Sequence, residues 1–195
     1  MRPLSASEQR AFGAALAKLH QFSSSRFGWA RDNHIGRTPQ PNAWKSDWIG
    51  FLRERRLGFQ LDLAARKGVK FRNAERLLDA LPRFFESYDP KPGLIHGDLW
   101  SGNFAATSAG DPVIFDPATY YADPEADFGL LFMFGGVTQE FWRGYQSVTP
   151  LADDFERRVP LYRLYHELNH ENLFSGYAAQ AQRSVDEALR LLEAG

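Results

Sequence analysis

A polar segment between two short apolar strands, near the middle of the 195-residue chain, constrains the fold more than any other feature. Leu94-Ile95 and Val113-Ile114-Phe115 are typical of short strands, because turn residues bound them. Between them lie the run His96-Gly97-Asp98-Leu99-Trp100-Ser101-Gly102-Asn103 and a turn-forming stretch of Ser108, Gly110, Asp111 and Pro112. This order predicts a small β-hairpin that carries the chemically active residues.

The polar run matches H-x-D-x-x-x-x-N, the spacing of a kinase catalytic loop. In such loops the Asp orients the attacking hydroxyl and the Asn holds Mg²⁺, which predicts these roles for Asp98 and Asn103. A second metal carboxylate is expected after a short hairpin, and Asp116 stands there. An isolated Asp or Asn near a turn is usually a local cap. Here four elements follow one another in the right order: a strand, His-x-Asp, the Asn, and a hairpin that leads to a second Asp. Their combination favours the catalytic interpretation.

The hairpin spacing predicts how the two metal-binding side chains meet. If Asn103 and Asp116 face each other, the centre of the hairpin falls between Ala109 and Gly110, inside the turn-forming stretch. Directly opposed residues on paired strands have Cβ atoms roughly 5 Å apart. An amide oxygen and a carboxylate at that separation can share a hard, oxygen-preferring cation.

Helical patterns dominate the sequence on both sides of this hairpin. Ser5-Ala6-Ser7-Glu8 is typical of a capping box, and Gly68 of a helix stop. The stretch 23–44 is rich in Ser, Gly, Pro and Asn, so we expect a long loop there. The predicted helices cover approximately residues 5–20, 47–67, 73–88, 125–134, 139–146, 153–174 and 180–193. We expect a mostly helical α+β fold, with residues 1–195 in one domain.

Composition excludes several classes of protein. Lys and Arg number 23 and Asp and Glu 24, so no basic surplus predicts a nucleic-acid or anionic-membrane partner. The absence of Cys excludes disulfides and Cys-ligated zinc, and it fits a reducing cytoplasm. The N-terminus lacks an apolar signal core, and the longest apolar stretch, 129–137, is short of the ~20 residues that span a membrane. We therefore expect a soluble, cytoplasmic protein.

Several segments resemble the fructosamine (ketosamine-3-) kinase family, which belongs to the aminoglycoside phosphotransferase-like and protein-kinase-like folds. The resemblance rests on the run from His96 to Asn103, on Ile114-Phe115-Asp116-Pro117-Ala118 and on Phe134-Gly135-Gly136. It continues in Arg26-Phe27-Gly28-Trp29, Pro39-Gln40-Pro41-Asn42, Trp44, Asp47-Trp48 and Leu168-Asn169-His170. His-Gly-Asp with a downstream Asp marks the broad phosphotransferase group, whereas the Leu-Trp-Ser-Gly-Asn continuation points to fructosamine kinases.

The resemblance implies phosphorylation, by ATP and with Mg²⁺, of the sugar 3-hydroxyl of a ketosamine on a small molecule or a glycated protein amine. Release of the amine would make the role deglycation repair. By this resemblance Asp98 is the base that orients the 3-hydroxyl, and Asn103 and Asp116 bind Mg²⁺. Trp100 is expected at the sugar site, with loop anchoring as the alternative. We expect His96 and Asp127 to support the catalytic loop.

The resemblance also implies a kinase-like C-terminal lobe without its N-terminal lobe. Kinases of this group begin with a strand-rich lobe that holds a phosphate-covering loop, a strand Lys and its helix Glu partner. Here the first predicted helix already starts at Ser5, and no Lys precedes Lys18. We therefore expect weak nucleotide binding by this chain alone and a homodimer through apolar surface near the first helix. An aminoglycoside-type phosphotransferase and a non-catalytic kinase-like binding module are the alternatives.

A competing pattern lies in a predicted helix near the C-terminus. His166-Glu167-Leu168-Asn169-His170 matches H-E-x-x-H, in which two His share a zinc ion and the Glu acts as base. No third His follows, which leaves Glu187 or Glu193 as the remaining ligand. The helix also has an apolar face typical of a core helix, formed by Phe155, Val159, Tyr162 and Tyr165. We therefore expect no zinc at this pair.

Overall fold

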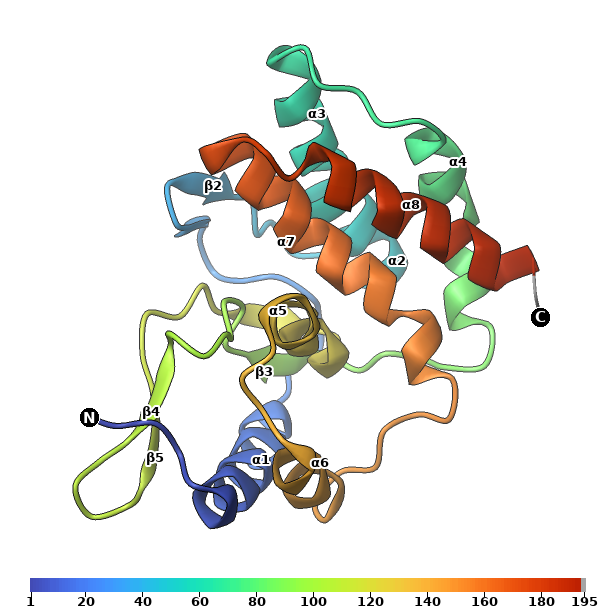
Figure 1. Cartoon of the computed structure of the whole chain (residues 1–195). Coiled ribbons are helices and arrows are strands. Elements are labelled where there is room, and N and C mark those ends of the chain that lie inside the picture. Colours follow the sequence, from blue (N-terminus) through green and yellow to red (C-terminus); the bar gives the residue numbers. More distant parts are fainter. Residues whose placement is uncertain (194–195) are drawn as a thin grey trace.

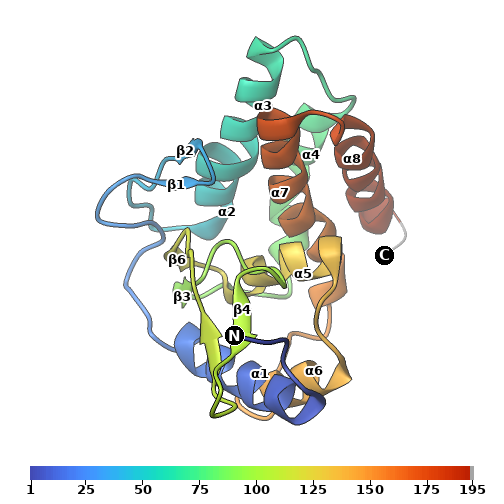
Figure 2. The ribbon, with the colours of Figure 1, turned by 60° about the vertical axis from the view of Figure 1, so that its left-hand side comes forward.

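The computed structural model describes residues 1–193 and consists of helices with three small two-stranded sheets (Figure 1). Helices α1 and α6 lie side by side at one end, α2–α4, α7 and α8 form the other end, and α5 lies between them (Figures 1 and 2). The α-helices are α1 (Ala6–His20), α2 (Trp48–Phe51), α3 (Gly58–Arg66), α4 (Ala74–Ala80), α5 (Phe128–Phe134), α6 (Gln139–Gln146), α7 (Val159–Phe174) and α8 (Ala178–Glu193). The short helices are η1 (Leu52–Leu57), η2 (Leu81–Phe85), η3 (Pro124–Asp127) and η4 (Phe155–Arg157). The strands are β1 (Asn33–Ile35), β2 (Thr38–Gln40), β3 (Gly93–Ile95), β4 (Phe104–Ala106), β5 (Pro112–Ile114) and β6 (Tyr120–Ala122).

Helix α1 begins at the predicted capping box, with Ser5 as its N-cap. Two glycines let α1 pack closely against α6. A Cβ atom on Gly13 would lie 2.1 Å from the backbone oxygen of Phe141, and one on Gly144 would lie 1.9 Å from that of Arg10. These contacts exclude any side chain at either position, so the helix pair is fixed by backbone approach as well as by apolar packing.

The predicted helix over 47–67 is confirmed as a continuous run of α2, η1 and α3. Asp47 caps its start by accepting a hydrogen bond from the third amide of the helix, and Gly68 ends it with a φ of 81°. The middle segment, η1, is a π-helical stretch, a feature that often marks functional positions. It carries Arg56, whose side chain is turned into the protein interior.

The long loop predicted for 23–44 is partly wrong, because β1 and β2 form an antiparallel hairpin within it. Of its three buried positions, one carries the apolar Ile35, and the other two carry the polar side chains of Thr38 and Gln40. Polar side chains of this kind form strands only where other parts of the fold supply hydrogen-bond partners. The alternating apolar pattern that predicts strands is therefore absent.

The predicted hairpin that follows Asn103 forms, but its register differs by one residue from the prediction. Strands β4 and β5 pair Phe104 with Ile114, and the amide of Phe115 donates to the carbonyl of Asn103 at 3.1 Å. Asn103 therefore faces Phe115, not Asp116. The cause is a three-residue loop in which Gly110 has a φ of 92°, because loop length and turn type set the register of a hairpin.

Two apolar cores hold the catalytic loop between them. One core lies among α2, α4, α7 and α8 and includes Ile95, which ends the strand before the loop. The other lies among α1, α5, α6 and β4 and includes Leu99, which lies within the loop. Because both side chains are almost fully buried, the polar residues between them are held by packing on both sides.

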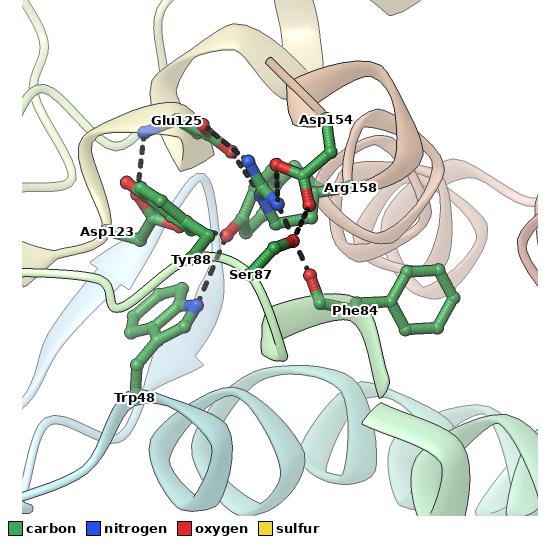
Figure 3. A network of polar contacts seen from close by, with 9 residues as sticks. Trp48, Phe84, Ser87, Tyr88, Asp123, Glu125, Asp154 and Arg158 are labelled. Carbon is green, nitrogen blue, oxygen red and sulfur yellow. Dashed lines mark hydrogen bonds and ion pairs between the residues drawn. The ribbon is translucent and has the colours of Figure 1, made fainter. Parts of the chain in front are cut away.

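A buried polar network connects η3 to α7 (Figure 3). Arg158 is fully buried and pairs with Glu125, with 2.7 Å between Nε and Oε2. The hydroxyl of Tyr88 donates to Asp123 at 2.9 Å, and the hydroxyl of Tyr162 donates to the other oxygen of the same carboxylate. A buried charge is tolerated only with partners of this kind, so the network fixes the position of η3.

These elements confirm a mostly helical fold with small sheets. Within residues 1–193, no helix is both long enough and apolar enough to cross a membrane.

Candidate active site

Asp127, at the end of η3, supports the loop that contains Asp98. Its fully buried carboxylate accepts hydrogen bonds from the backbone amides of His96 and Gly97, each at 2.7 Å, and contacts Nε2 of His20 at 3.0 Å. Burial alone would raise the pKa of Asp127, but the hydrogen bond and charge of His20 lower it below its usual value. The carboxylate is therefore charged and holds the loop backbone in one conformation.

His96 connects the loop to the strand before Asp116. Its Nδ1 accepts from the amide of Asp98 at 3.2 Å, and its Nε2 donates to the carbonyl of Phe115 at 2.9 Å. These two contacts require the neutral tautomer that carries its proton on Nε2. The ring thus sets the separation between the loop and the residue that precedes Asp116.

Asp98 and Asn103 are in direct contact. The Nδ2 atom of Asn103 donates to the backbone oxygen of Asp98 at 2.8 Å and to its Oδ2 at 3.1 Å. Burial raises the pKa of the half-buried Asp98, whereas the hydrogen bond from Asn103 acts in the opposite direction. The amide nitrogen is therefore occupied by Asp98, and the amide oxygen of Asn103 is left for another partner.

Asp116 lies one residue past the paired strands, with a φ of 52° that few residues other than Gly adopt. The residue is exposed, and its carboxylate makes no hydrogen bond or ion pair within the part of the chain described, residues 1–193. Mg²⁺ takes oxygen ligands and is commonly held by one or two protein groups together with phosphates and waters. The oxygens of Asn103 and Asp116 are chemically suited to that cation.

A pocket of about 440 Å³ lies beside Asp98. Trp100, which is 40% exposed, forms part of its wall and packs against Phe134, with 6.1 Å between the ring centroids. The Trp100 ring also covers Gly102, where a Cβ atom would lie 2.3 Å from it. The ring therefore both lines the pocket and packs on its own loop, and its place at a sugar site stays a prediction.

Sequence reasoning assigned no role to several other residues of this pocket. Asn169 and His170 enter it from α7, Tyr177 from the start of α8, and Ile35 and Gly36 from the turn between β1 and β2. Asn169 and His170 belong to one of the segments that resemble the family, and this is the one signal that points to them. Nothing in the local sequence pattern places the β1–β2 turn beside Asp98.

The H-E-x-x-H residues do not converge on one site. His166 faces a small internal cavity, His170 lines the pocket beside Asp98, and Glu167 lies on a different surface pocket with Arg163. Nδ1 of His170 contacts the backbone oxygen of His166 at 2.8 Å, which occupies one of the nitrogens that could bind a metal. Within residues 1–193, no three His, Cys, Asp or Glu side chains are placed to share a metal ion.

Comparisons with known proteins identify relatives over nearly the whole chain. The family model described as fructosamine kinase matches residues 2–191. A protein of Synechocystis sp. named as a ketoamine kinase is 46% identical over 181 residues, which cover 92% of this chain and 61% of that protein. A chloroplastic protein-ribulosamine 3-kinase of Oryza sativa is 44% identical over 195 residues, covering 96% of this chain and 56% of that protein. The chain thus spans less than two thirds of the length of these relatives.

The fold agrees with the sequence comparison. A solved structure from Thermobifida fusca, of a protein named as a fructosamine-3-kinase, superimposes with a TM-score of 0.89 at 32% identity. The match covers 97% of this chain and 67% of that one. The arrangement of helices and small sheets around Asp98 is therefore the arrangement found in that protein.

Proposed function

The chain belongs to the fructosamine kinase family, and on that basis we propose that residues 1–195 form a catalytic lobe that transfers the γ-phosphoryl group of ATP to the sugar 3-hydroxyl of a ketosamine. The observation that carries the proposal is the double position of Asp98. It is held by Asn103 on one side and lines the 440 Å³ pocket on the other. A base in that position lies between an acceptor hydroxyl bound in the pocket and a phosphoryl donor bound at the hairpin.

The polar residues of the site divide the tasks of this reaction among them. Asp98 orients the 3-hydroxyl and accepts its proton as the oxygen forms its bond to the γ-phosphorus and the bond to ADP breaks. Asn103 and Asp116 would hold Mg²⁺ through their oxygens, and the ion would supply positive charge beside the phosphates. Asp127 and His96 keep the loop in position through the hydrogen bonds described above.

The acceptor pocket fits an amine-bearing sugar. Its lining includes the polar side chains of Asp98, Asn169 and His170 and the aromatic rings of Trp100 and Phe134. Sugar hydroxyls can hydrogen-bond to these polar side chains, and an ammonium or apolar amine substituent is compatible with aromatic faces. A relative bears the name protein-ribulosamine 3-kinase, which supports a ketosamine on a protein amine or on a small molecule.

The decisive experiment uses the chain completed with a matching N-terminal lobe, because the chain alone is expected to bind nucleotide weakly and to phosphorylate no ketosamine at a useful rate. This completed protein, called the wild type below and carrying all the variants, is incubated with Mg-ATP and a synthetic fructosamine, and a sugar phosphate is followed by ³¹P NMR. We expect a 3-phosphate product with the wild type and a loss of turnover of about 10²–10⁴-fold in Asp98→Asn. A 3-deoxy ketosamine is the matched acceptor control and should yield no product. Unchanged turnover in Asp98→Asn would overturn the assignment, and phosphorylation of an aminoglycoside in place of the ketosamine would favour the alternative function.

A cytoplasmic location and a homodimer concern the molecule as a whole, and both stay predictions. The surface near the end of α1 exposes Phe22, which is 65% accessible, and the neighbouring hairpin exposes Ile114. Exposed apolar side chains of this kind favour self-association. Sedimentation velocity at a series of concentrations tests the dimer, and a single monomeric species throughout would contradict it.

A further inference from the structure

The turn between β1 and β2 forms one wall of the acceptor pocket, although it precedes the catalytic loop by a long stretch of chain. Ile35 pairs with Thr38, which leaves Gly36 and Arg37 as a two-residue turn. Gly36 has a φ of 58° in the first central position, where type II′ turns place glycine. Ile35 and Gly36 both line the pocket that contains Asp98.

Buried side chains of the hairpin hold this turn against the catalytic region. Gln40 is 1% exposed, and its Nε2 donates to the backbone oxygen of Ala118 at 3.0 Å and to Oδ1 of Asn33 at 2.8 Å. The hydroxyl of Tyr165, from α7, donates to Oε1 of the same Gln40 at 2.7 Å. Each polar atom of this amide group therefore has a partner, as expected of a buried polar side chain that fixes a structure.

Arg56 adds a second anchor from the π-helical segment η1. Its NH2 atom donates to Oδ1 of the fully buried Asn42 at 2.7 Å, and its NH1 atom donates to the backbone oxygen of Pro41, also at 2.7 Å. The guanidinium lies over the ring of Tyr120, 3.8 Å from its centroid. Movement of the hairpin away from the pocket would separate these buried groups, so the turn is a rigid wall.

Helix α7 approaches this turn from the other side of the pocket. A Cβ atom added to Gly36 would lie 3.1 Å from Cδ1 of Leu173, a tighter approach than side chains normally make. Leu173 lines the same pocket, and α7 also carries Asn169 and His170. Gly36 and the end of the Leu173 side chain are therefore almost in contact, and a side chain at position 36 would either push Leu173 aside or enter the pocket that both residues line.

We propose that Gly36 is a specificity-determining position that sets how large a ketosamine the pocket accepts, because a side chain there would enter the pocket or push Leu173 into it. The proposal rests on the ketosamine kinase activity proposed above. Because the β1–β2 turn is rigid, it cannot move outward to make room for a side chain at position 36. Such a side chain therefore reduces the volume of the pocket, and we expect the longest sugars to be excluded first. One methylene in a tight pocket changes selectivity by about tenfold or more, which sets the size of the expected effect.

The test uses Gly36→Ala and Gly36→Asn, since Asn tolerates a positive φ better than Ala does. The kcat/KM values are measured for fructosamine, ribulosamine and erythrulosamine that share one amine and differ in sugar length. Both variants should lose about tenfold in kcat/KM for fructosamine relative to erythrulosamine, through KM, with the KM for ATP unchanged. Gly68→Ala and Gly68→Asn are the matched controls, because Gly68 also has a positive φ but a Cβ there meets nothing within 4 Å.

The outcomes separate this proposal from the activity on which it rests. If the wild type phosphorylates no ketosamine, the proposed function fails. If it phosphorylates them and the Gly36 variants lose activity equally on all three sugars, or match the Gly68 variants, the specificity role of Gly36 is wrong. Thermal melting of each variant, compared with its Gly68 counterpart, shows whether any general loss comes from unfolding.

Discussion

The side chain of Asn103 holds the carboxylate of Asp98 through its amide nitrogen, with 3.1 Å between Nδ2 and Oδ2. The same nitrogen also reaches the backbone oxygen of Asp98, at 2.8 Å. Since Nδ2 is occupied, the amide oxygen is the atom that can bind a metal. One residue thus connects the proposed base to the proposed Mg²⁺ site, and its two functions can be separated by substitution.

Replacing Asn103 with Asp keeps an oxygen ligand but removes the donor to Asp98. We expect Mg-ADP affinity in Asn103→Asp to stay within about threefold of the wild type, while turnover falls by at least tenfold, because a donor becomes a second carboxylate beside the base. Asn103→Ala should lower both quantities. Calorimetry and steady-state kinetics measure them, and an Asn103→Asp variant with normal turnover would contradict the positioning of Asp98 by this residue.

Asp116 is the second proposed metal ligand, and its backbone conformation allows a substitution that changes the side chain alone. Asn is among the few non-glycine residues that tolerate a φ near 52°, so Asp116→Asn removes charge without adding backbone strain. We expect Mg-ADP binding to weaken by about tenfold or more and turnover to fall as well. Asp111→Asn, at an exposed position of the same hairpin, is the control and should bind as the wild type does. Equal binding by both variants would remove Asp116 from the metal site.

Asp127 should contribute to stability as well as to activity. In Asp127→Asn, the side-chain NH₂ group would face one of the two backbone N–H groups, of His96 or Gly97, that now donate to the carboxylate. The residue that contacts His20 would also lose its negative charge. We expect the free energy of unfolding to fall by about 3 kcal/mol, as for other broken buried charge interactions. Urea denaturation measures this loss. Asp89→Asn, an exposed position, provides the comparison, and a similar small change in both variants would show that the carboxylate is not a structural support.

The catalytic loop could be predicted from sequence because its spacing is fixed by local geometry. Asp98 and Asn103 lie within one loop, so five residues of chain bring them together however the rest of the molecule folds. The predicted partner of Asn103 was wrong by one residue because Gly110 allows an odd-numbered hairpin loop, and composition alone does not distinguish loops of two and three residues. A difference of one residue in loop length is enough to place Asp116 outside the paired strands.

The acceptor pocket could not be predicted in the same way. Its walls come from β1–β2, α5, α7 and the start of α8, which meet only through tertiary packing. The β1–β2 hairpin has no strand pattern because most of its inward positions are polar, and the partner of one of them, Gln40, is the distant Tyr165. Burial of an amide like Gln40 becomes favourable only after those partners are in place, and no window of local sequence contains that information.

His166 should make the stability of the protein depend on pH. Burial, together with the charge of His170, lowers the pKa of the His166 ring to about 3. In the unfolded chain the ring has its ordinary pKa, about 6.5, so between these values the unfolded state binds a proton that the folded state does not. The contribution of His166 is therefore complete above about pH 6.5 and is lost as the pH falls, by up to about 1.4 kcal/mol for each pH unit.

The measurement compares wild type with His166→Phe, which keeps a ring against Tyr165 and removes the titrating group. The free energy of unfolding in urea is determined at pH 7.5 and pH 5.5 for both proteins. The wild type should lose more stability than the variant on acidification, whatever the cost of the substitution itself. The difference between the two proteins is the readout, because burial raises the pKa of Glu125 to about 7 and this group acts with the opposite sign. Parallel losses in the two proteins would show that the His166 ring is protonated in the folded state.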